Sequence, residues 1–85
     1  MDSHTSLFDV NTIKKANITK TLNEVFASLQ EKGYNPVNQM VGYLISGDPG
    51  YISSYRDARS KIVALDRSEI VAVILKEYLK NKWDI

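Results

Sequence analysis

The sequence predicts an all-α domain with about four long helices, one short helical turn and a flexible N-terminal tail. Apolar residues recur at spacings of three and four along most of the chain, and no segment alternates convincingly with a period of two. Helix-stop and helix-start residues occur in pairs at two places within residues 31–52. The 85 residues are 44% apolar and 25% charged, which is ordinary for one soluble domain.

The first predicted helix ends near Lys32, a cation suited to the negative end of the helix dipole. Its start is open, because Asn11, Thr12 or Asn17 could each cap it. One apolar stripe follows the helical period and consists of Ile18, Leu22, Val25, Phe26 and Leu29. The preceding segment has small, polar and acidic residues without a period, so residues 1–10 are expected to form a flexible tail before a helical domain over 11–85.

The second predicted helix covers about residues 36–46. Gly33 can end the first helix in a left-handed conformation, while Asn35 and Pro36 supply a cap and a first residue for the second. Its expected apolar face consists of Val37, Met40, Val41, Leu44 and Ile45. Gly42 lowers helix stability by about 1 kcal/mol relative to alanine. It indicates either close approach of another helix or a loss of helix stability that the fold tolerates.

The remaining chain predicts one short turn and two further helices. Glycine, aspartate and proline at 47–49 repeat the stop and start pattern, which favours a helical turn over about 49–53. A third helix is expected over about 54–65, and a fourth begins after Asp66 and runs to about Lys82. Glu69 is placed to complete a capping box with the residue that caps this helix. The expected buried side of the last helix consists of Ile70, Val71, Ile74, Leu75, Tyr78 and Leu79.

The inventory of reactive residues argues against an enzyme. The chain has no cysteine, which excludes thiolate catalysis and cysteine-ligated metal. Its single histidine, His4, falls in the predicted tail, where no second group holds it in a fixed geometry. The glycines at 47–50 do not form a phosphate loop, because no strand precedes them and no lysine with serine or threonine follows. The prediction is a non-catalytic protein with no cofactor and no metal site.

Arg56, Arg59, Lys61 and Arg67 form the only local excess of basic charge, offset by nearby aspartates. They are either a solvated helix face or arginine forks for a partner's carboxylates or phosphate. The alternative from another functional class is a small helical nucleic-acid-binding regulator that uses the helices over 54–65 and 67–82. The net charge of +1 and the few phosphates that this surface would neutralise speak against it.

The tail carries hydroxyl groups at Ser3, Thr5 and Ser6, which a kinase can reach on a flexible segment. Phosphorylation adds about −1.5 to −2 charge near neutral pH. The phosphate would either dock on the arginine surface or be repelled by acidic neighbours in the tail. No apolar run is long enough to span a bilayer and the start of the chain does not read as a signal peptide, so the expected location is cytoplasmic, without membrane insertion.

The segment EKGYNPVNQMVGYLISGDPGYI over residues 31–52, with DAR at 57–59 and DRSEI at 66–70, closely resembles the IreB/ReoM family of Gram-positive bacteria. The resemblance implies a small cytosolic helical homodimer without known catalytic activity. Members are substrates of the Ser/Thr kinase with extracellular PASTA repeats and of its partner phosphatase. They regulate cell-wall synthesis and tolerance to cell-wall antibiotics, in part of the family through proteolytic turnover of the first committed enzyme of peptidoglycan precursor synthesis.

The resemblance also assigns candidate residues. The family's phosphoacceptor is a tail threonine followed by an aromatic residue, which makes Thr5 the expected site, with Ser6 and Ser3 as alternatives. Arg59 and Arg67 stand where the family has arginine, whereas Ser54 and Val63 replace expected arginines. The partner surface is therefore expected around Arg56, Arg59 and Arg67, with Arg56 as a partial substitute. The resulting hypothesis is an adaptor that changes partners when Thr5 is phosphorylated.

Overall fold

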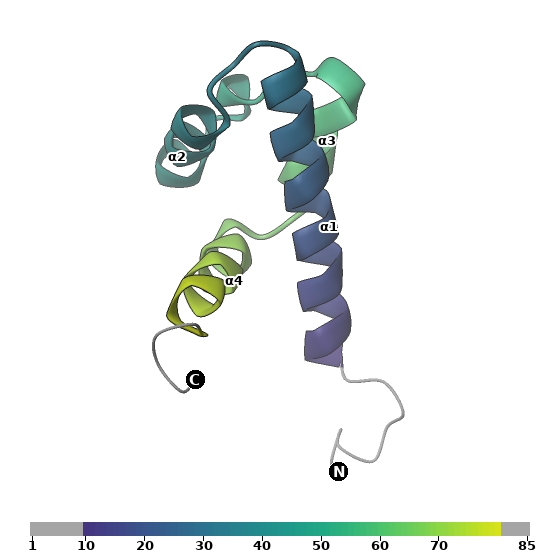
Figure 1. Ribbon diagram of the computed structural model, residues 1–85, viewed down its shortest axis with the longest axis vertical. Coiled ribbons are helices and arrows are strands. Elements are labelled where there is room, and N and C mark those ends of the chain that lie inside the picture. The colour runs from purple at the N-terminus through teal and green to yellow at the C-terminus, as the bar shows by residue number, and fades with distance from the viewer. Residues whose placement is uncertain (1–9, 81–85) are drawn as a thin grey trace.

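The computed structural model describes residues 10–80, and all regular structure in this range is helical. The chain forms α1 (Val10–Glu31), α2 (Pro36–Ser46), α3 (Ala58–Val63) and α4 (Arg67–Lys80), with 3₁₀ turns η2 (Pro49–Tyr51) and η3 (Tyr55–Asp57) (Figure 1). The all-α prediction is confirmed for the described residues. The candidate phosphoacceptors Ser3, Thr5 and Ser6 lie outside them.

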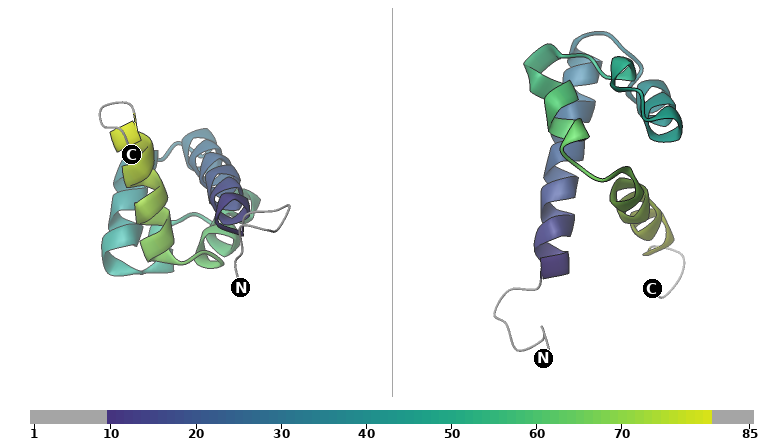
Figure 2. Two further views of the ribbon diagram at one scale, coloured as in Figure 1. Left: turned by 90° about the horizontal axis from the view of Figure 1, so that it is seen from below. Right: turned by 180° about the vertical axis from the view of Figure 1, so that it is seen from behind.

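Helix α1 runs along the length of the described domain, and the other elements pack against it. Helix α3 lies beside its C-terminal half, and these two helices share the most extensive contact in the fold. Helices α2 and α4 lie on the same side of α1, one beyond the other along its axis (Figure 2). The N-terminal half of α1 therefore has α4 as its neighbour.

The apolar stripe predicted on α1 forms the centre of the core. Val25 and Leu29 are fully buried, Ile18 and Leu22 nearly so, and Phe26 packs against them at the core edge. The rest of the core comes from every other helix and consists of Met40, Tyr43, Ile52, Ala58, Ile62 and Ile70. The period of apolar residues in α1 thus identified the side that the fold buries.

The boundary between α1 and α2 follows the predicted chemistry. Gly33 has φ 94°, and the amide of Tyr34 donates to the carbonyl of Leu29 at 2.9 Å, which closes the end of α1. The side chain of Asn35 accepts a hydrogen bond from the amide of Asn38 at 3.1 Å and caps α2. The predicted range 36–46 is confirmed.

Gly42 allows another segment to pack closely against α2, in line with the first of the two interpretations of this glycine. A β-carbon there would collide with the ring of Tyr51, which comes from the turn η2 rather than from another helix. The side-chain amide of Gln39 donates to the carbonyl of Tyr51 at 2.9 Å and holds this turn against α2. The turn itself is capped by Asp48, which accepts from the amide of Gly50 at 2.8 Å.

The expected continuous helix over 54–65 is wrong. Arg56 and Asp57 have φ values of 54° and 61°, in the left-handed region, so a right-handed helix cannot pass through them. The chain makes the turn η3 instead and begins α3 only at Ala58. Ala58, the residue that follows this pair, is fully buried against the core.

Helix α4 differs from its prediction at its start and on its apolar side. Asp66 caps the helix, but the carboxylate of Glu69 pairs with Lys14 instead of completing a capping box. Ile70 is the only fully buried residue of the expected face, and Leu79 is half-buried. The other members are exposed by 38–59%, namely Val71, Ile74, Leu75 and Tyr78. One chain covers only one edge of α4, because Ile70 and Val73 alone pack on the core.

Candidate functional site

Thr5 lies five residues before Val10, the first described residue and the start of α1. The chain enters α1 at the end that faces away from the connection to α2 (Figure 1). The nearest described neighbours in the sequence belong to the N-terminal turns of α1, beside α4. The tail is thus attached at the opposite end of α1 from Glu31.

Arg56 lies at the C-terminal end of α1. Its Nε lies 3.0 Å from a carboxylate oxygen of Glu31, and its guanidinium stacks 5.7 Å from the centre of the Tyr55 ring. The ammonium of Lys32 approaches the same ring at 5.3 Å. Hydrogen bonding to Tyr55, and then the charge of Glu31, raise the pKa of Arg56 above its ordinary value. This arginine is a charged surface group with one intrachain carboxylate partner.

Arg59 lies at the start of α3 and links two segments of the domain. Its Nε donates to the carbonyl of Ile52 at 2.8 Å, the residue is exposed, and the guanidinium has four further N–H donors on its terminal nitrogens. It borders an open hollow of about 460 Å³. Ser54 and Val63, the two positions where the resemblance led us to expect arginine, border the same hollow. Three positions singled out from the sequence therefore meet in one place.

Arg67 serves the junction between α2 and α4. Its Nη1 donates to the carbonyl of Leu44 at 3.1 Å, in the last turn of α2, where a cation also favours the helix dipole. Its guanidinium lies directly over Gly47, where a β-carbon would come within 2.8 Å of Cζ. Gly47 has φ 76° and ends α2 in a left-handed conformation. Arg67 thus stabilises the junction between α2 and α4. A partner could bind only the N–H donors of its guanidinium that do not contact Leu44.

The three arginines do not converge on one ligand. Arg56 pairs across to α1, Arg59 borders the hollow beside α3, and Arg67 covers the corner of α2. Each has an intrachain acceptor, and each guanidinium has five N–H donors. Of the three, Arg59 has the arrangement best suited to a partner's carboxylate or phosphate, because it borders the open hollow and its Nε binds a carbonyl rather than a carboxylate.

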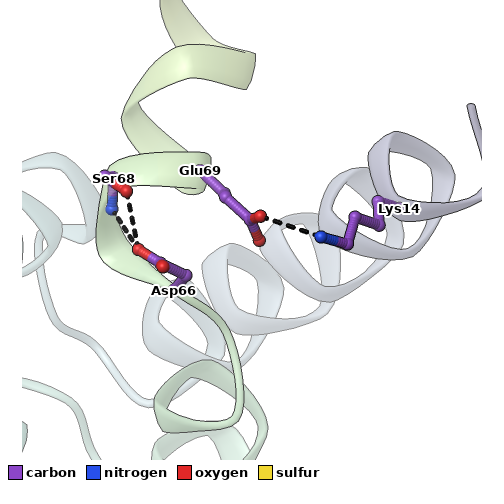
Figure 3. A network of polar contacts seen from close by, with 4 residues as sticks. All are labelled: Lys14, Asp66, Ser68 and Glu69. Atoms are coloured by element: carbon purple, nitrogen blue, oxygen red, sulfur yellow. Dashed lines mark hydrogen bonds and ion pairs between the residues drawn. The ribbon is translucent and has the colours of Figure 1, made fainter. Parts of the chain in front are cut away.

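Sequence reasoning missed a second polar region, between the N-terminal half of α1 and α4. Figure 3 shows Lys14 of α1 reaching Glu69 of α4, at 3.1 Å. Asp66 accepts from both the hydroxyl of Ser68, at 2.7 Å, and its amide, at 2.9 Å. These two bonds, the hydroxyl first, lower the pKa of Asp66. Tertiary packing decides which face of α1 contacts α4, so no local sequence pattern predicted the ion pair between Lys14 and Glu69.

A further unexpected feature is the exposure of apolar stripes on two helices. On α2, Val37, Val41 and Ile45 recur every four residues and are exposed by 60%, 48% and 79%. On α4 the exposed stripe consists of Val71, Ile74, Leu75 and Tyr78. Contiguous apolar surface of this kind marks protein interaction sites in soluble proteins.

Within residues 10–80, no group of three histidine, cysteine, aspartate or glutamate residues is placed to hold a metal ion. In the same range, no helix is both long and apolar enough to cross a membrane. Comparison with protein families gives a match to the model of the IreB regulatory phosphoprotein over residues 3–80. The match covers the helices described above and most of the segment that precedes them.

Proposed function

The chain belongs to the family of IreB regulatory phosphoproteins, and on this basis we propose that it is a non-catalytic regulator switched by phosphorylation of Thr5. The observation that carries the proposal is the extent of the family match, which includes both Thr5 and the helical domain. The modifying enzymes are the PASTA-type Ser/Thr kinase and its partner phosphatase. Both act on it in the cytoplasm.

The proposed output is control of peptidoglycan synthesis and of tolerance to cell-wall antibiotics. The protein acts through proteolytic turnover of the first committed enzyme of peptidoglycan precursor synthesis, by binding that enzyme or the protease adaptor. The guanidinium of Arg59, at the border of a hollow that also contains Asp57, supports a contact with an acidic group of such a partner. Ser54 and Val63 at its border supply no charge, so Arg59 is the main cationic contact there, with Arg56 and Arg67 as flanking contributors.

The proposed active form is a homodimer. The exposed stripes on α2 and α4 lie on helices on the same side of α1, and together they offer the apolar surface that a second copy would bury (Figure 2). A domain of this size also has a thin stability margin, which association would enlarge. Neither stripe shares a residue with the lining of the hollow beside Arg59.

The test of the switch is phosphosite mapping after incubation with a PASTA-type kinase domain. Intact mass and fragmentation should show one phosphate on Thr5, removed by the partner phosphatase. The Thr5→Ala variant should lose it, while the matched Ser6→Ala variant keeps it. Phosphate only within residues 10–80, or none, would contradict the proposal.

The test of the output is capture of the precursor enzyme or its protease adaptor by phosphorylated and unphosphorylated protein. We expect the two forms to differ in binding, and Arg59→Ala to weaken the binding form about tenfold or more, as expected for loss of a charge-assisted hydrogen bond. Lys20→Ala, an exposed cation on α1 without an ion pair in residues 10–80, is the control. Equal binding by both forms and by the Arg59 variant would remove this surface from the proposal.

A further inference from the structure

An open groove of about 350 Å³ lies between the N-terminal half of α1 and α4. Ile18 and Val73 contribute apolar lining, and its border carries the ammonium groups of Lys14, Lys15 and Lys76. Glu69 is the one acidic residue in the lining. The groove therefore has two more positive than negative lining charges.

The other two hollows described in the structure lack this excess. The hollow beside Arg59 has Asp57 as a compensating charge, and the hollow beside Arg56 pairs two cations with Glu24 and Glu31. Among the described hollows, the groove between α1 and α4 is thus the one with a net positive lining. Of the three hollows, this groove therefore offers a phosphate dianion the most favourable electrostatic interaction.

The lysines of the groove differ in how firmly they are held. Lys14 contacts Glu69 at 3.1 Å, and Lys15 contacts Glu77 at 3.6 Å, a carboxylate that it shares with Lys80. Lys76 has no ion pair with any residue from 10 to 80. All the pairs are solvent-exposed and weak, so a phosphate can replace the carboxylates without a large loss.

Chain length decides which cations a phosphate on Thr5 can reach within one molecule. Thr5 lies five residues before Val10, a distance along the chain that spans at most about 18 Å. Lys14 and Lys15 lie only about 6–8 Å along α1 from Val10, by the helical rise. Glu31, the partner of Arg56, lies about 31 Å along the same helix. The lysines are within reach and Arg56 is not.

We propose that phosphothreonine 5 docks in this groove of its own chain, where Lys14, Lys15 and Lys76 donate hydrogen bonds to the phosphate oxygens. The inference rests on the proposed modification of Thr5. Docking ties the tail to α4, beside the exposed apolar stripe of that helix. Phosphorylation then changes the surface between α1 and α4, which shares no lining residue with the hollow beside Arg59.

The experiment uses the full chain with phosphothreonine installed at residue 5 during synthesis, so that no kinase is needed. Amide chemical shifts are compared with those of the unmodified chain at low and at high salt. We expect changes at Ala72, Val73 and Lys76, which are remote from Thr5 in the sequence. Salt should reduce them, because the contacts are exposed charges.

A pair of variants makes the test specific. Lys76→Gln should reduce the shift changes on α4 by roughly a third, since one of three cations is lost. Lys20→Gln, which removes another exposed cation that does not line the groove, should leave them unchanged. Absent changes on α4, or equal changes in both variants, would overturn the docking proposal.

Mixed dimers distinguish docking of the phosphate in its own chain from docking on the partner chain. An isotope-labelled, unmodified chain is combined with an unlabelled phosphorylated chain, and changes on the labelled α4 would show that the phosphate binds the partner, against docking in its own chain. Failure of the kinase to modify Thr5 would contradict the proposed function alone, because the installed phosphate still tests the groove. A modified Thr5 that leaves α4 unchanged would contradict the groove alone.

Discussion

Helices α1 and α4 have similar apolar stripes in the sequence, but the structure buries the stripe of α1 and leaves most of the stripe of α4 exposed. In α1, Val25 and Leu29 are fully buried, and the stripe forms the centre of the core. In α4, Ile70 is fully buried while Ile74 and Leu75 are exposed by 39% and 52%. The period of apolar residues is equally regular in both helices, so periodicity predicts a face and not what covers it.

The difference follows from the number of neighbours that each helix has within one chain. Helix α1 is contacted by α2, α3, η3 and α4, whereas α4 has α1 as its main neighbour. A helix with one neighbour buries one edge, and its remaining apolar surface stays accessible unless another molecule covers it. The proposed homodimer would restore to α4 the burial that its sequence predicts.

The largest expected effect comes from truncating the covered stripe. Leu29→Ala should lower the free energy of unfolding by about 2–5 kcal/mol, because it removes a fully buried side chain and leaves a cavity. Denaturant unfolding at several protein concentrations measures it. The loss should be present at every concentration, and a loss below about 1 kcal/mol would mean that α1 is not the core helix.

A smaller effect is expected at the contact between α2 and η2. Gly42→Ala gains up to about 1 kcal/mol of helix propensity but places a methyl group into the ring of Tyr51, at a cost of about 1–3 kcal/mol. Net destabilisation by about 1 kcal/mol should result. In a Tyr51→Ala background the same substitution should become stabilising, and destabilisation in both backgrounds would contradict the contact.

The start of α4 should contribute stability that depends on pH. Ser68 holds the pKa of Asp66 below its usual range, so the folded state binds this proton less readily than the unfolded chain. The contribution is fully present above about pH 4 and is lost as the pH falls through the folded-state pKa. Asp66→Asn keeps a capping side chain but should lower stability at pH 7 and less at pH 3. A difference that does not depend on pH would contradict the assignment.

The smallest effect on the isolated fold is expected on the exposed stripe. Leu75→Ala should change the unfolding free energy of the monomer by about 0.5 kcal/mol or less, in contrast to the same substitution at residue 29. Leu75→Glu should instead shift sedimentation toward the monomer. Val63→Glu, at an exposed apolar residue outside both stripes, should leave the assembly unchanged. Dimers that tolerate Leu75→Glu would exclude α4 from the interface.

The candidate site was predictable in part. Arg59 was identified from the resemblance, and the structure places it beside Ser54 and Val63, the two positions flagged as departures. Arg67 was also identified, but its bond to Leu44 and its place over Gly47 depend on the corner between α2 and α4. The lysine groove had no local signal, since its cations come from two different helices, with Lys14 and Lys15 on α1 and Lys76 on α4.

The sequence by itself determined the helical class, the caps at Asn35, Asp48 and Asp66, and the buried face of α1, because propensity, capping and period act over a few residues. Tertiary structure alone decided the left-handed break at Arg56 and Asp57, the partner of Glu69 and the exposure of α4. These features depend on which surfaces meet in space. Contacts between distant segments set them, and local preference does not specify such contacts.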